Sequence, residues 1–162
     1  MTTYEQIIAN LKDSNPTQAE LMEDEIDIII HKLKFLTEDS FPTVVIISQN
    51  NDFQPIHTAL LAEKVKLAGG KLASGMNEDP QVILIIQNSN ELYQVLPSYL
   101  SDLKAQKIRA LLENKVYILQ SNINENSQEN YVRDTEILAE IIQHKYFFYG
   151  REGGDWLKFD LA

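Results

Sequence analysis

The sequence has 162 residues, of which 44% are apolar, and it contains no cysteine. A chain of this length usually forms one domain, and the lack of cysteine excludes disulfide bonds, thiolate catalysis and cysteine-ligated zinc. The formal net charge of -10 argues against binding to nucleic acids or to anionic membranes, because both require a cationic protein surface.

Two helices are predicted before the first strand. Thr2 or Thr3 is expected to cap a short helix, which the sequence SNP at 14–16 ends. Thr17 is expected to cap a longer helix over 18–36, because apolar residues recur there at three- and four-residue spacing. This spacing predicts one buried stripe made of Leu21, Met22, Ile26, Ile29, Ile30 and Leu33.

Three continuous apolar runs predict strands that are covered on both faces, as in a parallel sheet. These runs span residues 43–48, 81–86 and 115–120, and a further short strand is predicted in KLAS at 71–74. The segments between them have helical spacing. Pro55 suits the first turn of a helix that ends at AGG, 68–70; the next helical stretch is expected to break near Pro97, and the last helix covers 131–147.

Strands that alternate with helices are typical of right-handed crossovers over a mostly parallel sheet. We therefore predict an α/β fold, a three-layer α/β/α and Rossmann-like domain with about four strands and helices on both faces. Residues 1–40 are expected to form N-terminal helices that pack on or extend from the core, 41–149 the α/β core, and 150–162 a C-terminal turn with a packed tail or edge strand.

Ligands of such sheets bind outside the carboxyl ends of the strands. The segments that follow the three predicted strands are rich in Asn, Gln and Ser, which bind polar ligands but also simply favour turns. Arg133 offers a planar guanidinium to a ligand carboxylate, or else pairs with Asp134 or Glu136. The candidate ligand-binding residues are Asn50, Asn51, Phe53, His57, Gln87, Asn88, Tyr131 and Arg133, with the two aromatic rings as stacking groups.

Motifs for catalysis or metal binding are missing from the sequence. The histidines at 31, 57 and 144 share no metal-ligand spacing. The nucleophile elbow, the phosphate loop and the dinucleotide fingerprint are all absent. His57 and Glu78 remain the only plausible acid–base groups, so a non-catalytic role is favoured.

Five segments follow one another in a characteristic order: FPTVVIIS after a long helix, LLAEKVKLAGG, DPQVILII, IRALLENKVYIL and RDTEILAEIIQHKYF. In this order they resemble the C-terminal lobe of class III substrate-binding proteins, the helical-backbone receptors of ABC importers for cobalamin, siderophores and haem. The resemblance covers Phe41 to Phe147, and the helix 17–36 corresponds to the end of the rigid helix that joins the two lobes.

The resemblance implies a small-ligand or partner-binding module, with cobalamin, haem or a ferric siderophore as the implied ligand. Because the family binds its ligand between two lobes, a lone lobe is expected to pair with a second copy or with a separate partner lobe. Two alternatives stay open: a protein–protein interaction or dimerisation domain that has lost ligand binding, and a chelatase-like enzyme. The sequence shows no leader and no membrane-spanning run, so a cytoplasmic location is expected.

The segment YFFYGREGGDWLKFD, 146–160, holds three of the six glycines and the only tryptophan. A phosphate-binding glycine loop follows a strand and opens a helix, whereas this segment follows a helix. We therefore expect it to reverse the chain. Trp156 is expected to anchor the tail, and Arg151 and Glu152 to face water.

Overall fold

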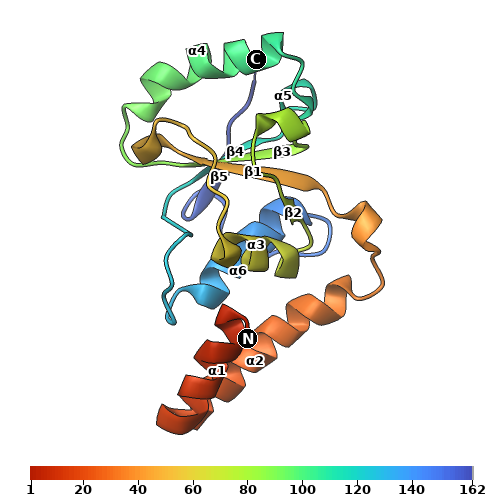
Figure 1. Cartoon of the computed structure of the whole chain (residues 1–162), viewed down its shortest axis with the longest axis vertical. Coiled ribbons are helices and arrows are strands. Elements are labelled where there is room, and N and C mark those ends of the chain that lie inside the picture. The colour runs from red at the N-terminus through yellow and green to blue at the C-terminus, as the bar shows by residue number, and fades with distance from the viewer. Residues whose placement is uncertain (162) are drawn as a thin grey trace.

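The computed structural model describes residues 1–161 and is built around a five-stranded sheet (Figure 1). The strands are β1 (Thr43–Ser48), β2 (Lys71–Leu72), β3 (Val82–Ile86), β4 (Val116–Leu119) and β5 (Trp156–Lys158). Their spatial order is β2-β1-β3-β4-β5, in which only β5 is antiparallel to its neighbour. The predicted mostly parallel α/β fold is confirmed, and the C-terminal tail supplies the fifth strand.

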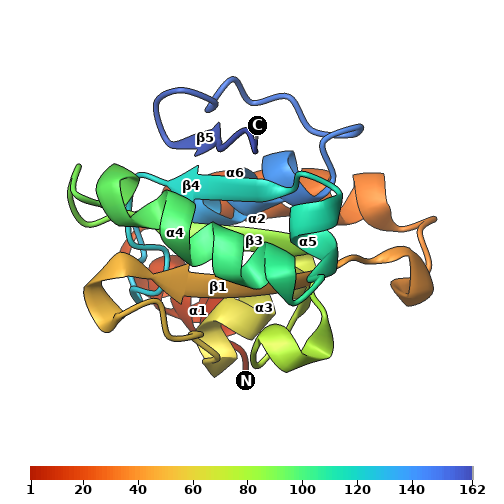
Figure 2. The same cartoon turned by 90° about the horizontal axis from the view of Figure 1, so that it is seen from above.

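Helices cover both faces of the sheet (Figures 1 and 2). The α-helices are α1 (Thr3–Ser14), α2 (Pro16–Leu33), α3 (Ala59–Leu67), α4 (Leu92–Ala105), α5 (Arg109–Leu112) and α6 (Tyr131–Ile142), and short 3₁₀ turns occupy Glu38–Ser40, Gln49–Asn51 and Met76–Glu78. α4 and α5 lie on one face, α3 and α6 lie on the other, and α1 and α2 form a hairpin beyond α3 and α6. Within residues 1–161, each helix is too short or too polar to reach across a lipid bilayer.

The continuous apolar strands are explained by the two-sided core. In β1, Val44 and Ile46 contribute to the core under α3 and α6, whereas Val45 and Ile47 contribute to the core under α4 and α5. Successive side chains of a strand point to opposite faces. Every position of a strand that is covered on both faces must therefore be apolar.

The start of α2 differs from the prediction. Asn15, not Thr17, caps the helix: its side-chain oxygen accepts a hydrogen bond from the Gln18 N–H at 3.3 Å, and Pro16 takes the first position, where a missing N–H costs nothing. The predicted buried stripe is also too wide, because Leu21 is 53% exposed and Ile30 is 45% exposed. The predicted cap of α1 is confirmed at Thr2, as part of a capping box with Glu5.

The predictions made from Pro55 and Pro97 were wrong. Pro55 forms a bridge to Ile47, and α3 begins only after Thr58, whose hydroxyl accepts from the Leu61 N–H at 3.1 Å. Pro97 lies inside an unbroken α4. A proline in a helix costs about 3 kcal/mol, and the burial of four leucines along α4 offsets this cost: Leu92, Leu96, Leu100 and Leu103.

Glu63 of α3 holds α1 on the core. Its carboxylate accepts hydrogen bonds from the Thr3 N–H at 2.9 Å, the Tyr4 N–H at 3.0 Å and the Tyr131 hydroxyl. The Tyr4 and Tyr131 rings stack with their centroids 5.8 Å apart. A tertiary contact therefore satisfies two N–H groups that α1 leaves unpaired, with a negative charge where the helix dipole favours one.

The segment that follows α6 wraps around a second carboxylate, that of Glu140. This buried group accepts from the N–H groups of Tyr149, Gly150 (2.9 Å) and Arg151 (3.1 Å) and from the Trp156 indole (2.8 Å). Gly150 adopts φ 75°, which favours glycine. The glycine-rich segment thus reverses the chain and delivers β5 to the sheet edge.

Three side chains of this segment can be compared with their predictions, and Glu152 is exposed as predicted. Trp156 is 7% exposed and packs edge-to-face on Tyr117, so it anchors the tail as predicted. Arg151 is only partly exposed, because its guanidinium donates to Glu136 on α6 at 2.6 Å and to Asp155 in the turn at 2.8 Å.

We predict that Trp156→Ala lowers the free energy of unfolding by about 3–5 kcal/mol, because a buried aromatic ring and an indole hydrogen bond are lost. Urea denaturation measures the change. Phe148→Ala is the matched control, since this ring is 81% exposed and its removal should change stability by less than about 0.5 kcal/mol. An unchanged denaturation midpoint for the Trp156 variant would show that the tail is not anchored.

We also predict that stability falls in alkaline solution. Burial raises the pKa of Tyr4 and that of Tyr149 to about 12. The neutral phenol is therefore favoured in the folded state, and its stabilisation is complete below about pH 10 and is lost as the pH rises through about 12. Denaturation midpoints measured across this range should fall more steeply for the native sequence than for the double variant Tyr4→Phe, Tyr149→Phe. Equal slopes would contradict the prediction.

Candidate functional site

The carboxyl ends of β1, β3 and β4 lie at the same edge of the sheet, at the left of Figure 1. Three loops leave the sheet there: residues 49–58, 87–91 and 120–130. This carboxyl edge is where ligands of open parallel sheets bind, and six of the eight predicted site residues lie in its first two loops.

The first two loops are joined by the side chain of Gln49. Its carbonyl oxygen accepts from the N–H groups of Asn88 (2.7 Å) and Ser89 (2.9 Å), and its amide nitrogen donates to the Ser89 hydroxyl at 3.0 Å. The Gln87 amide donates to the Ser89 carbonyl at 3.1 Å. These hydrogen bonds fix the positions of the two loops relative to each other.

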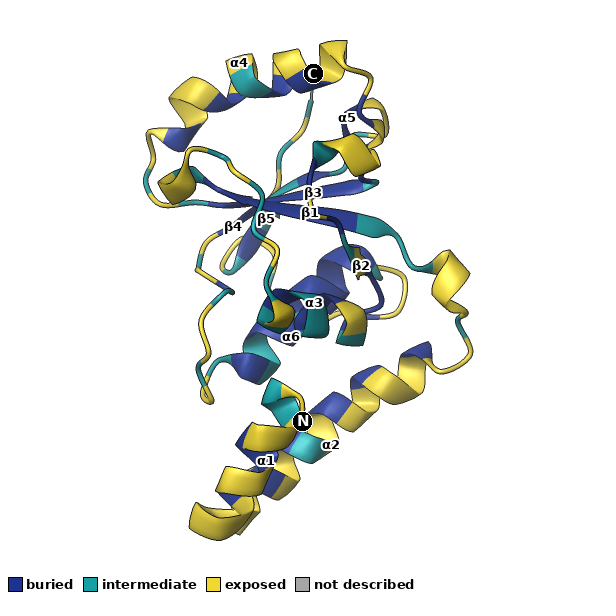
Figure 3. Cartoon of the chain, viewed as in Figure 1, coloured by how far each residue is buried: buried dark blue, intermediate teal, exposed yellow. Residues whose placement is uncertain are grey.

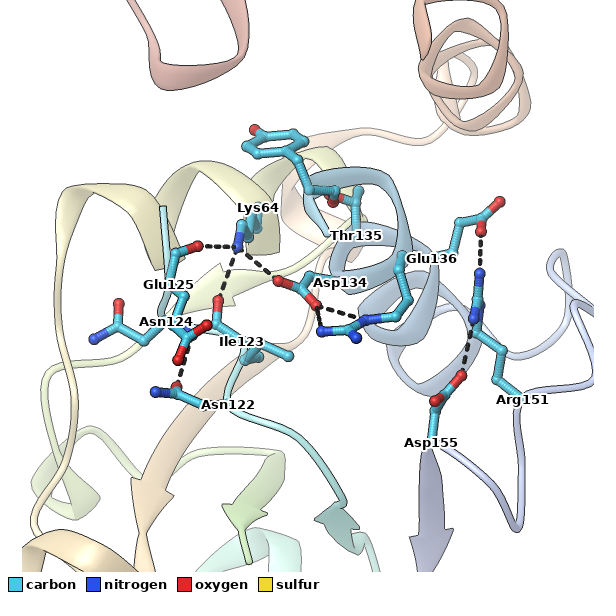
Figure 4. Close-up of polar contacts among 12 residues, drawn as sticks. Lys64, Asn122, Ile123, Asn124, Glu125, Asp134, Thr135, Glu136, Arg151 and Asp155 are labelled. Carbon is cyan, nitrogen blue, oxygen red and sulfur yellow. Dashed lines mark hydrogen bonds and ion pairs between the residues drawn. The ribbon is translucent and has the colours of Figure 1, made fainter. Parts of the chain in front are cut away.

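The third loop is held by a buried ion pair between α3 and α6 (Figure 4). Lys64 Nζ donates to Asp134 Oδ2 at 2.9 Å and to the carbonyl of Ile123 at 2.8 Å. The two side chains are 0% and 1% exposed. Asp134 also accepts from Arg133 at 2.9 Å, so both charges are fully bonded, as burial requires.

A second contact ties the same loop to the start of α3. The hydroxyl of Thr58 donates to the Asn124 side chain at 2.8 Å while it also caps the helix. All three loops of the carboxyl edge are therefore fixed by named side-chain contacts and are not held by turn geometry alone.

The predicted site residues divide by exposure. Phe53, Gln87 and Arg133 are partly buried, and Phe53 stacks on Tyr99 with centroids 4.7 Å apart. Tyr131 belongs to the core, and its hydroxyl is bound to Glu63, so its ring is not available for stacking on a ligand. The exposed candidates are Asn50, Asn51, His57 and Asn88.

Arg133 takes the second of its two predicted alternatives, since it pairs with Asp134. His57 lies before α3, which begins at Ala59. Hydrogen bonds from the Ser74 hydroxyl and N–H, together with the charge of His57, lower the pKa of Glu78.

Within residues 1–161, the structure holds no group of three or more His, Asp or Glu residues suited to a metal ion.

Sequence reasoning missed the residues that fix the loops: Gln49, Thr58, Lys64 and Asp134. One signal was present for Lys64. It lies on the apolar side of α3 with Leu61 and Val65, where a lysine has to find a buried partner. The partners of Gln49 and of Thr58 lie 40 and 66 residues away, and no local pattern indicates them.

Comparison with known protein families gives no match, and comparison with curated proteins gives none either. Solved structures do resemble the chain. An ABC transporter solute-binding protein from Sulfurospirillum deleyianum superposes with a TM-score of 0.65 and 16% identity, over 90% of this chain and 52% of that one. An ABC transporter substrate-binding protein from Listeria monocytogenes gives 0.62 and 19%, over 85% and 62%.

Helicobacter pylori CeuE in a nickel–histidine complex also superposes, with a TM-score of 0.62 and 13% identity over 88% of this chain and 52% of that one. At such identities the similarity shows the fold. The chain spans about half the length of two of these proteins and 62% of the third. The predicted resemblance to a single lobe of a solute-binding protein is confirmed at the level of the fold.

We predict that Lys64→Met lowers the free energy of unfolding by about 3–5 kcal/mol, because Asp134 is left as a buried charge that lacks its main partner. The double variant Lys64→Met, Asp134→Leu should recover part of this loss. Lys66→Met, at an exposed position of the same helix, is the control. Urea denaturation measures all three, and a near-native Lys64→Met would show that the pair does not hold the loop.

Proposed function

We propose that this domain binds a small ligand at its carboxyl edge and catalyses no reaction. The observation that carries the proposal is the bracing of all three loops by Gln49, Thr58 and Lys64, which leaves the side chains of Asn50, Asn51 and Asn88 exposed. A site that is fixed before the ligand arrives loses little entropy on binding. The similarity of its fold to solute-binding proteins supports ligand binding as the role of the domain.

The chemistry of the edge favours a neutral, amide-rich ligand. Asparagine amides donate and accept hydrogen bonds without charge, and the net charge of -10 disfavours a polyanion. Arg133, the one site arginine, is already paired with Asp134. Of the three implied ligands, cobalamin carries neutral amides at its periphery, whereas haem carries two carboxylates. We therefore rank cobalamin above haem and ferric siderophores.

A single lobe supplies one wall of a binding cleft. Because related solute-binding proteins are longer than this chain, we propose that a second lobe, from a partner or from a second copy, completes the site. Binding by this chain alone should then be weak, since it buries only one side of the ligand.

Equilibrium dialysis tests the proposal with cyanocobalamin, haemin, a ferric tris-catecholate and the nickel–histidine complex as separate probes. We predict saturable binding of cyanocobalamin that the double variant Asn51→Lys, Asn88→Lys weakens by about tenfold, the effect of losing one or two hydrogen bonds.

The double variant Asn10→Lys, Gln18→Lys adds the same two charges at exposed positions of α1 and α2 and serves as the control, with unchanged binding expected. No binding of any probe up to near-millimolar concentration would refute ligand binding by this chain. Binding that is unaffected by the double variant would place the site elsewhere.

A further inference from the structure

The outer face of α2 and the turn after it carry apolar side chains that are largely exposed in the described chain, residues 1–161. Leu21 is 53% exposed and Ile28 is 52% exposed. Phe35, in the turn directly after the helix, continues the line and is 86% exposed. Leu21 and Ile28 are seven positions apart, so they lie on the same side of the helix, away from the buried stripe. Phe35 is seven positions further along the chain, in the turn after the helix. Figure 3 shows this outer face exposed along the helix.

Charge is divided along α2 between its two halves. The N-terminal half is acidic, with Glu20, Glu23, Asp24, Glu25 and Asp27, and the C-terminal end is basic, with His31, Lys32 and Lys34. A parallel copy of the helix would place like charges together. An antiparallel copy places the acidic half of each helix against the basic end of the other, and a two-fold axis produces this match twice.

We propose that two copies of this chain associate through α2, antiparallel, about a two-fold axis that passes beside Ile28. In this register Ile28 meets its own equivalent and Leu21 meets Phe35 of the second copy. Glu25 meets Lys32, and Asp24 meets His31. Charge complementarity and the row of apolar side chains therefore both favour a second copy of this chain as the partner of α2.

The surface beside the axis is suited to this contact. A shallow hollow of about 520 Å³ lies next to Ile28, lined by Asp24, Asp27, His31 and Lys32. It is large enough to receive side chains of the second copy. Lys32 is held in place, because its Nζ donates to the Tyr146 carbonyl at 3.0 Å and lies over the Phe147 ring, yet the residue remains exposed.

One pair of helices buries less than the roughly 1,600 Å² of a standard interface, and two copies of net charge -10 repel each other. The dimer is therefore weak and concentration-dependent. The proposal rests on α2 alone and is independent of ligand binding at the carboxyl edge, so failure of one does not imply failure of the other.

Light scattering on a dilution series tests the association. The mass should rise with concentration from 18.6 kDa toward twice that value. Ile28→Asp places two carboxylates at the axis and should keep the chain monomeric. Leu112→Asp is the matched control, because Leu112 is 61% exposed on α5, on the opposite face of the sheet, and should still dimerise. A monomer at every concentration, or a dimer that Ile28→Asp leaves intact, would overturn the proposal.

A charge exchange tests the orientation. Glu25→Lys and Lys32→Glu should each be folded by circular dichroism and monomeric, because each brings like charges together. An equimolar mixture should form a heterodimer, since the introduced lysine of one variant meets the introduced glutamate of the other and the native pair remains on the second side. A mixture of folded variants that stays monomeric overturns the antiparallel pairing, and this is also the result expected if an unrelated partner covers α2.

Discussion

The buried pair of Lys64 and Asp134 is the contact on which the carboxyl edge depends. Removing two charges from water is costly, and attraction between them repays the cost only when their remaining hydrogen bonds are satisfied. Here the carbonyl of Ile123 and the guanidinium of Arg133 complete the bonding. The same contacts join α3, the last loop and α6, so the long polar loop has a defined position despite a sequence rich in asparagine.

Acidic side chains have structural roles elsewhere in the fold. Glu63 accepts N–H groups at the start of α1, and Glu140 accepts those of the C-terminal turn. In each case a carboxylate on a core helix satisfies backbone donors of a segment that lacks regular partners of its own. Some of the acidic side chains behind the net charge of -10 therefore serve the fold itself.

The strands could be predicted almost to the residue, because a strand covered on both faces must be apolar at every position. The helix break predicted at Pro97 and the helix start predicted at Pro55 were wrong. Burial of leucines outweighs the cost of Pro97 within α4, and Pro55 pairs with β1 before α3 begins. At the site, the exposed asparagines followed from the topology of parallel sheets. The burial of Tyr131 did not, because it depends on Glu63, 68 residues away.

The position of β5 has a consequence for how the sheet ends. A strand edge with free N–H and carbonyl groups is a template for pairing with other chains. β5 lies along β4, and the strand at the other edge, β2, has only two residues. During synthesis, the β4 edge stays open until residues 156–158 have been made. Completion of the C-terminal turn then places β5 along Tyr117, Ile118 and Leu119 and covers this edge.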